Sequence, residues 1–320
     1  MKEFLKSIGF APASEFEKIE KGGSARAFFR FADAKKGNCI FCEYSAEKEE
    51  NFLYADIAKF LRQNGVCAPE IFFHDPSKRI LVMQDAGKTD LLDFCKNADK
   101  ETAISAYKKA LSNAAILHEK ATKSFFKSPI KLMPGFDKKL YAWEREYFFE
   151  NLILKHLDLA LPRPQKEWEA LSKTFEAAPQ TLVHRDFQSQ NVIVKDGGAE
   201  VAFIDFQGMR LGSFWYDLGS MMFDAYSAAL DREMKMELLK YYCDLRKIEL
   251  NFGLFYKFSA QRLMQALGAY AFLSDTKGKR EYLKFISPAL NSLVYCAEKA
   301  DMPETLKIAR AAQKKLEERG

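Results

Sequence analysis

The stretch that decides the fold of this chain is LVHRDFQSQN, residues 182–191. It begins with two apolar residues, places a carboxylate at Asp186 and reaches an amide at Asn191, where an Asn-Val-Ile-Val strand starts. A turn at Gly197-Gly198 folds the chain back into a second apolar strand that ends at Asp205. The return brings Asp205 near Asn191, and hard oxygen ligands of this kind suit magnesium, which bridges substrate phosphates. The pattern therefore predicts a carboxylate beside a site for magnesium and phosphate.

The order and spacing of these residues are typical of kinases. Phosphoryl transfer needs positioning and charge neutralisation more than covalent help from the protein. The chain has the spacing His-x-Asp-x4-Asn followed by Asp205-Phe206-Gln207-Gly208, and kinases combine a catalytic loop with a later metal-binding Asp in this order. A lone Asp or Asn more often caps a turn, but four such residues in this order favour catalysis. The sequence predicts an ATP-dependent small-molecule kinase, because Gln207 stands where protein kinases have glycine and no A-P-E triplet follows.

Length and composition set wider limits on the protein. The 320 residues are 48% hydrophobic and 29% charged, which is ordinary for a globular protein. The net charge of +5, from 49 basic and 44 acidic side chains mixed along the chain, argues against nucleic-acid binding. Cys39 and Cys42 form a C-x-x-C, but without a second pair or an adjacent histidine they indicate a buried strand rather than a metal site. Reduced thiols and the lack of a signal peptide or a membrane-length apolar run predict a cytoplasmic protein with no membrane partner.

The chain divides into a short strand-rich part and a long helical part. Residues 1–84 alternate strand and turn patterns around one helical stretch and predict a small antiparallel sheet with one helix. Residues 85–320 predict helices with only one strand pair, at residues 192–204. After that pair, helices are expected over residues 218–247, 252–274, 281–299 and 303–318. We therefore expect an α+β, protein-kinase-like fold with two lobes: a nucleotide-binding lobe (1–84) and a lobe for catalysis and acceptor binding (85–320).

The catalytic motifs resemble those of the aminoglycoside phosphotransferase and choline kinase family. The resemblance runs from residues 182–191 through residues 204–207 to Tyr216-Asp217-Leu218. Within that family the chain is most similar to the bacterial anomeric amino-sugar kinases, which phosphorylate N-acetylmuramate and N-acetylglucosamine at C1. Three further stretches carry this closer similarity: residues 22–26, residues 65–69, and residues 261–268 with 277–279. The motifs are specific for the fold and the reaction, and only weakly specific for the acceptor.

The resemblance implies roles for the acidic and amide residues of the motifs. Asp186 would be the catalytic base that orients the acceptor hydroxyl, which requires hydrogen-bond reach to that hydroxyl. Asn191 and Asp205 would hold Mg²⁺ on the phosphates of ATP. The site is therefore expected to use ATP and magnesium as its cofactors.

Three neighbouring residues would support this chemistry. His184 would brace the catalytic loop, and Arg185 would help to neutralise phosphate charge, with an exposed salt bridge as its alternative. Asp217 would tie the catalytic loop to the helix that follows. Its alternative, a helix N-cap before Leu218, would do much the same structural work.

The nucleotide end of the site is predicted from a glycine loop and a hinge. Glycines let backbone N–H groups approach phosphate closely, although they also simply make turns. The residues expected to contact phosphate are Gly22, Gly23, Ser24 and Ala25. Met83 and Gln84 fall where the resemblance places the hinge, whose backbone would contact adenine. No G-x-x-x-x-G-K-[ST] motif occurs, which argues against a Walker-type kinase.

The third strand lacks the lysine that kinases pair with a helix glutamate to hold the phosphates. The strand reads Ile-Phe-Cys-Glu-Tyr over residues 40–44, which puts an acid, Glu43, where the lysine is expected. The amino-sugar kinases often lack this lysine too. Lys21, Arg26 and Lys48 are candidate replacements, although a residue of this kind is more often a solvated surface charge.

The acceptor is expected close to the two catalytic carboxylates. Gln188 and Gln207 follow Asp186 and Asp205, and amides suit sugar hydroxyls, whereas a polycation calls for a cluster of carboxylates. Arg262 is expected on a helix facing the same cleft, where it would bind a carboxylate such as a lactyl group. The expected partner is a small molecule with a hydroxyl group. The anomeric hydroxyl of N-acetylmuramate or N-acetylglucosamine, in cell-wall recycling, is favoured.

Other functions stay open on the sequence alone. The same chemistry would serve an aminoglycoside, choline or methylthioribose phosphotransferase. A nucleotide-binding pseudokinase is suggested by the missing lysine and the plain glycine loop, although the intact Asp186, Asn191 and Asp205 argue against it. No oligomeric state follows from the sequence.

Overall fold

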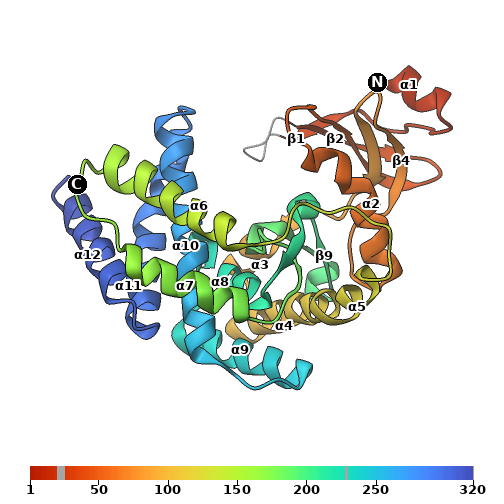
Figure 1. Cartoon of the computed structure of the whole chain (residues 1–320). Helices are drawn as coiled ribbons and strands as arrows, with labels where there is room; N and C mark the ends of the chain where they lie inside the picture. Colours follow the sequence, from red (N-terminus) through yellow and green to blue (C-terminus); the bar gives the residue numbers. More distant parts are fainter. Residues whose placement is uncertain (20–25, 228–229, 320) are drawn as a thin grey trace.

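The chain folds into two lobes, a small one built on a sheet and a large one built mainly of helices (Figure 1). The computed structural model describes residues 1–19, 26–227 and 230–319. The predicted α+β architecture, with an antiparallel sheet in the N-terminal lobe and helices in the C-terminal lobe, is confirmed. The lobe boundary between residues 84 and 85 stays a prediction.

The N-terminal lobe consists of one antiparallel sheet between two helices. Across the sheet the strands are β1 (Glu17–Ile19), β2 (Ala27–Asp33), β3 (Gly37–Glu43), β5 (Ile80–Gln84) and β4 (Ile71–Asp75). The helices are α1 (Lys2–Ser7) and α2 (Glu50–Gln63). Each helix covers one face of the sheet, so apolar side chains are buried on both faces.

The side chains of β3 alternate between these two faces. Cys39 and Phe41 pack with Leu5 of α1, whereas Ile40 and Cys42 pack on the side of α2. This alternation follows from strand geometry, in which successive side chains point to opposite faces. The two thiols of the C-x-x-C are buried, free and on opposite faces, so they cannot form one metal site together.

Two short sheets in the C-terminal lobe position the loops of the site. One has the order β6 (Thr89–Asp90), β8 (Val192–Lys195) and β9 (Glu200–Phe203). The other pairs β7 (Thr181–Val183) with β10 (Arg210–Gly212). The catalytic loop runs from the end of β7 to the start of β8, and the Asp205 loop runs from β9 to β10. The two loops are neighbours because β8 pairs with β9 and β7 pairs with β10.

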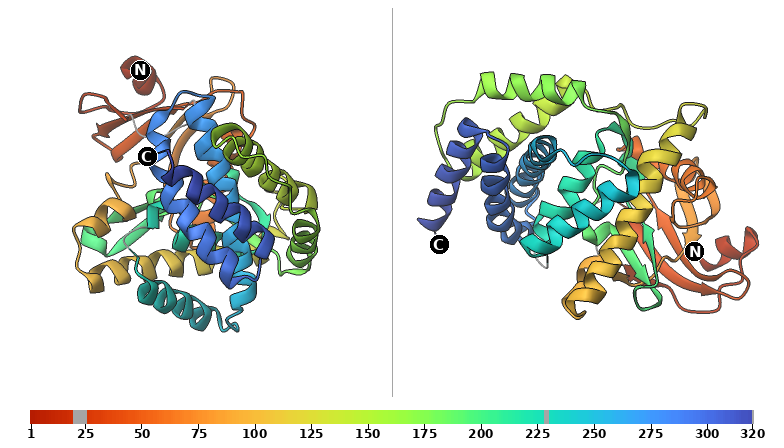
Figure 2. Two further views of the ribbon diagram at one scale, coloured as in Figure 1. Left: turned by 90° about the vertical axis from the view of Figure 1, so that its left-hand side faces the viewer. Right: turned by 90° about the horizontal axis from the view of Figure 1, so that it is seen from below.

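Helices form the remainder of the C-terminal lobe. Those between β6 and β7 are α3 (Leu91–Lys96), α4 (Lys100–Ile116), the π-helix η1 (Leu117–Ala121), α5 (Thr122–Phe125), α6 (Lys138–Phe148), the π-helix η2 (Phe149–His156) and α7 (Gln165–Ala177). Those after β10 are α8 (Phe214–Phe223), α9 (Arg232–Arg246), α10 (Phe252–Asp275), α11 (Ile286–Lys299) and α12 (Pro303–Glu317). α10 lies among the others, because it packs against α6, α8 and α11 (Figure 2). No described helix is both long enough and apolar enough to cross a membrane.

Two sequence predictions for this lobe are wrong. The single expected strand pair is accompanied by β6, β7 and β10, which have two or three residues each and are too short to show an alternating pattern. The single helix expected over residues 218–247 is two helices, α8 and α9. Asp231 begins α9 as its N-cap by accepting a hydrogen bond from Met234 N at 2.8 Å, and an aspartate is favoured at that position.

Gly268 lets α10 and α6 approach closely, and we expect Gly268→Ala to lower the free energy of unfolding by about 1–3 kcal/mol. A Cβ at Gly268 would lie 2.8 Å from Phe148 N and 2.9 Å from Phe148 Cα, so the two helix backbones would have to move apart. Denaturant unfolding of the purified variant measures the loss. Gly253→Ala on the same helix is the control, because a Cβ there meets only Asn251 Oδ1 at 3.4 Å, and its effect should stay within about 1 kcal/mol. Equal stability of the two variants would contradict the close packing.

Candidate active site

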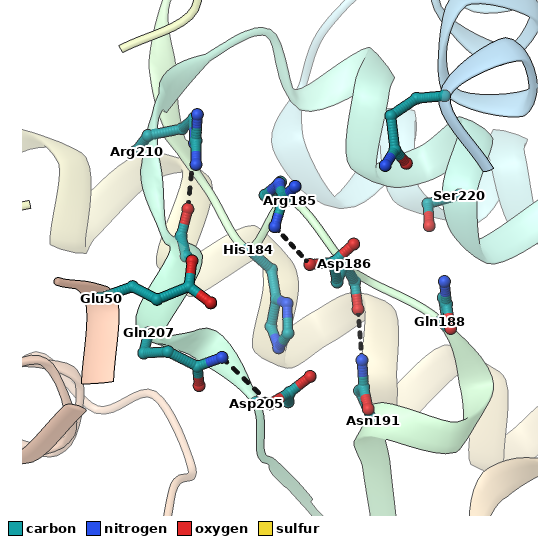
Figure 3. Close-up of polar contacts among 12 residues, drawn as sticks. Glu50, His184, Arg185, Asp186, Gln188, Asn191, Asp205, Gln207, Arg210 and Ser220 are labelled. Atoms are coloured by element: carbon teal, nitrogen blue, oxygen red, sulfur yellow. Dashed lines mark hydrogen bonds and ion pairs between the residues drawn. The ribbon is translucent and has the colours of Figure 1, made fainter. Parts of the chain in front are cut away.

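The Asp186 carboxylate of the catalytic loop lies between the guanidinium groups of Arg185 and Arg262, and Figure 3 shows its contact with Arg185. Asp186 Oδ2 accepts a hydrogen bond from Arg185 Nη1 at 3.0 Å, and Oδ1 lies 3.5 Å from Arg262 Nη2. Asn191 closes the loop, because its Nδ2 donates to the Asp186 carbonyl at 2.8 Å. The Asp186 side chain keeps 25% of its surface exposed. The carboxylate is therefore oriented by the protein and still accessible to a small molecule.

The charge of Asp186 is set by these neighbours. Burial alone would raise the pKa of the carboxyl group, but the charges of Arg185 and Arg262 outweigh it and hold the pKa of Asp186 below its ordinary value. His184 and Arg210 act in the same direction. Asp186 is therefore ionised at neutral pH and accepts hydrogen bonds from a ligand.

Asp217 fixes the backbone of the catalytic loop from within α8. Its Oδ2 accepts a hydrogen bond from His184 N at 2.6 Å, and its Oδ1 accepts one from Arg185 N at 2.9 Å. His118 Nε2 donates to the same carboxylate at 3.0 Å. Arg185 needs this support because its φ of +75° is a left-handed conformation that is unfavourable for a residue with a side chain. The N-cap alternative for Asp217 is wrong, since α8 already begins at Phe214.

His184 links the catalytic loop to the segment that carries Asp205. Its Nε2 donates to the Ile204 carbonyl at 2.9 Å. The ring is 1% exposed and lies against the rings of Phe187 and Phe203. The position of His184 suits the bracing role that the resemblance implies, and it leaves the ring no exposed edge for a substrate.

Asn191 and Asp205 present oxygen atoms side by side at the ends of β8 and β9 (Figure 3). Ile204 N donates to the Asn191 carbonyl at 3.0 Å, which brings the two residues together. Asp205 Oδ1 accepts hydrogen bonds from Arg26 and, at 3.1 Å, from Gln207 Nε2. Within residues 1–19, 26–227 and 230–319, no donor reaches Asp205 Oδ2 or Asn191 Oδ1. This pair of oxygens fits Mg²⁺, which takes few protein ligands and completes its shell with water and phosphate.

Within the described part of the chain, no group of three or more His, Cys, Asp or Glu side chains is placed to hold a metal ion. A magnesium ion at Asn191 and Asp205 would also take oxygens from a nucleotide, as is usual for Mg²⁺ in kinases.

The residues predicted for the nucleotide lie in two places. The predicted phosphate contacts lie outside the described residues: Gly22, Gly23, Ser24 and Ala25. Met83 is buried in β5, and Gln84 ends that strand, where the chain leaves the sheet for the C-terminal lobe. Arg30 holds the next residue, because its Nε donates to Asp85 Oδ2 at 2.6 Å. The predicted hinge is thus a short, fixed connection.

Glu43 does not take the place of the missing lysine, and this prediction is wrong. Glu43 is exposed, whereas its neighbour Cys42 faces α2 and lies within electrostatic reach of Arg26 and Tyr54. The error is one residue of register, and in a strand one residue changes the face. Burial raises the pKa of the Cys42 thiol to about 12, so the position carries no charge.

Two of the three cations considered as replacements for that lysine differ in their exposure and in their ion pairs. Lys48 has a side chain 62% exposed and lies 3.9 Å from Glu50. Arg26 has a side chain only 11% exposed and forms an ion pair with Asp205. Lys21 lies outside the described residues.

A buried network that the sequence analysis missed lies beside Asp186. Asp224 Oδ2 accepts hydrogen bonds from Gln188 Nε2 at 3.1 Å and from Arg262 Nη2 at 3.0 Å. Asp224 Oδ1 accepts one from the Tyr270 hydroxyl at 2.6 Å. Two of the predicted acceptor residues, Gln188 and Arg262, are therefore held by Asp224. The third, Gln207, is not part of this network. No local pattern marked Asp224 or Tyr270, because their partners are distant in sequence.

Arg210 adds a further buried cation to the cluster, and the sequence analysis missed it too. Its side chain donates through Nε to the Gly208 carbonyl at 3.0 Å, and its guanidinium lies 5.4 Å from the centre of the Phe136 ring. Among the described residues, no carboxylate lies within ion-pair distance of Arg210. Burial and the nearby charge of Arg185 lower the pKa of Arg210. The surroundings of Asp186 are therefore rich in positive charge.

Kinases of the protein-kinase-like fold place a catalytic aspartate and their metal ligands on two such loops below a small sheet. The fold and the site together define this chain as a small-molecule kinase of that class. The chain belongs to the phosphotransferase enzyme family, whose model matches residues 15–250. The resemblance seen in the sequence is thereby confirmed.

Individual relatives support the family and the fold. The N-acetylmuramate/N-acetylglucosamine kinase of Caulobacter vibrioides is 24% identical over 246 residues, 72% of this chain and 66% of that protein. The match thus spans just under two thirds of that relative. A choline/ethanolamine kinase family protein from Mesorhizobium loti superposes with a TM-score of 0.64 at 15% identity, covering 93% of both chains. A thermostable mutant of the aminoglycoside phosphotransferase APH(4)-Ia, in complex with ADP and hygromycin B, superposes with a TM-score of 0.59 at 13% identity, covering 97% of both chains.

Proposed function

We propose that this chain is a cytoplasmic kinase that uses ATP and Mg²⁺ to phosphorylate the anomeric hydroxyl of an amino sugar, in cell-wall recycling. The amino sugars concerned are N-acetylmuramate and N-acetylglucosamine. The observation that carries the proposal is the ionised Asp186 carboxylate, held by Arg185 and Arg262 and partly exposed. We assign nucleotide binding to residues 1–84, and catalysis and acceptor binding to residues 85–320.

The chain's own residues would share the chemistry as follows. Asp186 would accept the hydrogen bond of the acceptor hydroxyl and aim its oxygen at the γ-phosphorus. Arg185 would keep Asp186 ionised and in place. Asn191 and Asp205 would hold Mg²⁺, which when bound neutralises charge on the phosphates of ATP. In the reaction the new oxygen–phosphorus bond forms to the acceptor, the bond to the ADP oxygen breaks, and the hydroxyl proton is released.

The charges around Asp186 favour a neutral or anionic acceptor. Three positive charges lower the pKa of Asp186, those of Arg185, Arg210 and Arg262. The nearby Asp224 is buried and already bonded to Arg262 and Tyr270. A choline or an aminoglycoside is cationic, and electrostatic complementarity would require free carboxylates around it. The Caulobacter vibrioides relative, whose name specifies an amino-sugar kinase, also supports a sugar.

A panel of acceptors tests the proposal, with ATP turnover and the phosphorylated product followed for each compound. We expect turnover with N-acetylglucosamine or N-acetylmuramate and none with choline or an aminoglycoside, because the cluster repels cations. The methyl 1-glycoside of N-acetylglucosamine is the matched control, since it differs only by lacking a free anomeric hydroxyl and should not react. Turnover of that glycoside would disprove the anomeric position. Tight ATP binding without turnover of any acceptor would instead favour a pseudokinase.

A further inference from the structure

A partly buried ion pair joins the two lobes at the nucleotide end of the site. Arg26 precedes β2 in the N-terminal lobe, and its Nη2 donates to Oδ1 of Asp205 in the C-terminal lobe. The Arg26 guanidinium also lies 5.6 Å from the centre of the Phe28 ring. A guanidinium is not deprotonated in proteins, so Arg26 is a permanent cation beside a residue assigned to hold magnesium.

Arg26 lies within electrostatic reach of the third strand at Cys42. Cys42 is the strand residue that packs on the side of α2, and its buried thiol is uncharged. Tyr54 of α2 stacks on Phe206 of the Asp205 loop, with ring centres 4.5 Å apart. The Arg26 charge acts on both Cys42 and Tyr54. A cation from the residue just before β2 thus lies near Cys42, where the third strand supplies no charge.

The chemistry of the pair suits phosphate better than a purely structural bridge. A guanidinium carries five N–H donors in a planar fork that matches phosphate oxygens. The Asp205 oxygen that Arg26 holds is Oδ1, and Oδ2 has no donor among the described residues. Arg26 and a metal ion can therefore share Asp205 through different oxygens.

We propose that Arg26 is the cation that binds the phosphates of ATP in this kinase, in place of a lysine on β3. Arg26 would bridge Asp205 and the phosphates, which ties the N-terminal lobe to the nucleotide and to the metal-binding loop at once. The inference rests on the proposed use of ATP, and it is independent of the acceptor.

Nucleotide binding without acceptor tests the role of Arg26. Calorimetry with ATP plus Mg²⁺, and separately with adenosine, would be done on the full chain and on Arg26→Gln, Arg26→Lys and Lys48→Gln. Arg26→Gln should weaken ATP binding by about ten- to a hundredfold, because a charged hydrogen bond to phosphate is lost. Its adenosine affinity should not change, and Arg26→Lys should recover part of the ATP affinity. Lys48→Gln removes an exposed cation of the same lobe and should match the unmodified chain.

The possible failures are distinguishable. ATP affinity unchanged in Arg26→Gln would overturn the role of Arg26, and so would an equal loss for ATP and adenosine, since the effect would not depend on phosphate. A full chain that binds ATP no better than adenosine would contradict the proposed use of ATP before any variant is compared. A wrong acceptor assignment would appear only in the acceptor panel and would leave these binding constants untouched.

Discussion

Replacing Asp186 with asparagine is expected to lower kcat by about 10²- to 10⁴-fold, the usual contribution of a catalytic base, while ATP still binds. The change keeps the size of the side chain and removes its charge. Arg185 and Arg262 now hold an ionised carboxylate and would face a neutral amide, which cannot take up the hydroxyl proton. ATP binding should persist, because the groups assigned to the metal are Asn191 and Asp205. Steady-state kinetics and calorimetry with ATP measure the two effects separately.

Asp196→Asn is the matched control for this substitution. Asp196 is an exposed carboxylate in the turn between β8 and β9, with a φ of +47° that asparagine adopts readily. Its replacement removes the same charge close to the loop in sequence but away from the chemistry, and kcat should not change. If Asp186→Asn retained kcat within about tenfold of the unmodified chain, Asp186 would not be the base.

Local spacing made the proximity of the proposed catalytic and metal-binding residues predictable from sequence. The path from His184 to Asn191 and the hairpin to Asp205 are short, so residue order alone brings these groups together. The prediction that placed Glu43 at the lysine position was off by one residue, because successive side chains of a strand point to opposite faces of the sheet. Sequence spacing locates a strand, and only its packing against α2 shows which side points to the site.

The surroundings of Asp186 were not predictable in the same way. Asp224 collects Arg262 and Tyr270 from a different helix, and Gln188 from the catalytic loop. These contacts depend on how the end of α8 packs against α10 and against the catalytic loop, and packing of distant segments leaves no periodic signal in a sequence. The acceptor end was therefore predicted as individual residues, while the charge pattern that bears on acceptor choice emerges only from the fold.

Asp217 also connects distant segments, because it holds the catalytic loop from α8. Asp217→Ala is expected to lower the free energy of unfolding by about 2–5 kcal/mol. Asp217 is fully buried and accepts hydrogen bonds from the backbone N–H groups of His184 and Arg185. Alanine would leave both donors buried and unpaired, along with His118 Nε2. Denaturant unfolding measures the loss. The kcat of the folded Asp217→Ala protein should also fall, because Arg185, which precedes Asp186 and has a left-handed backbone, would lose the carboxylate that holds it.

Two companion variants separate this anchor from a general loss of charge. Asp244→Ala removes an exposed carboxylate from α9 and should change the unfolding free energy by no more than about 0.5 kcal/mol. Asp217→Asn should lie between the two, because its amide oxygen still accepts from one backbone N–H while its NH₂ group faces the other. An Asp217→Ala protein as stable and active as the unmodified chain would show that the loop holds its shape without α8. The strained φ of Arg185 would then need another source of support, and the described residues offer none as direct as this carboxylate.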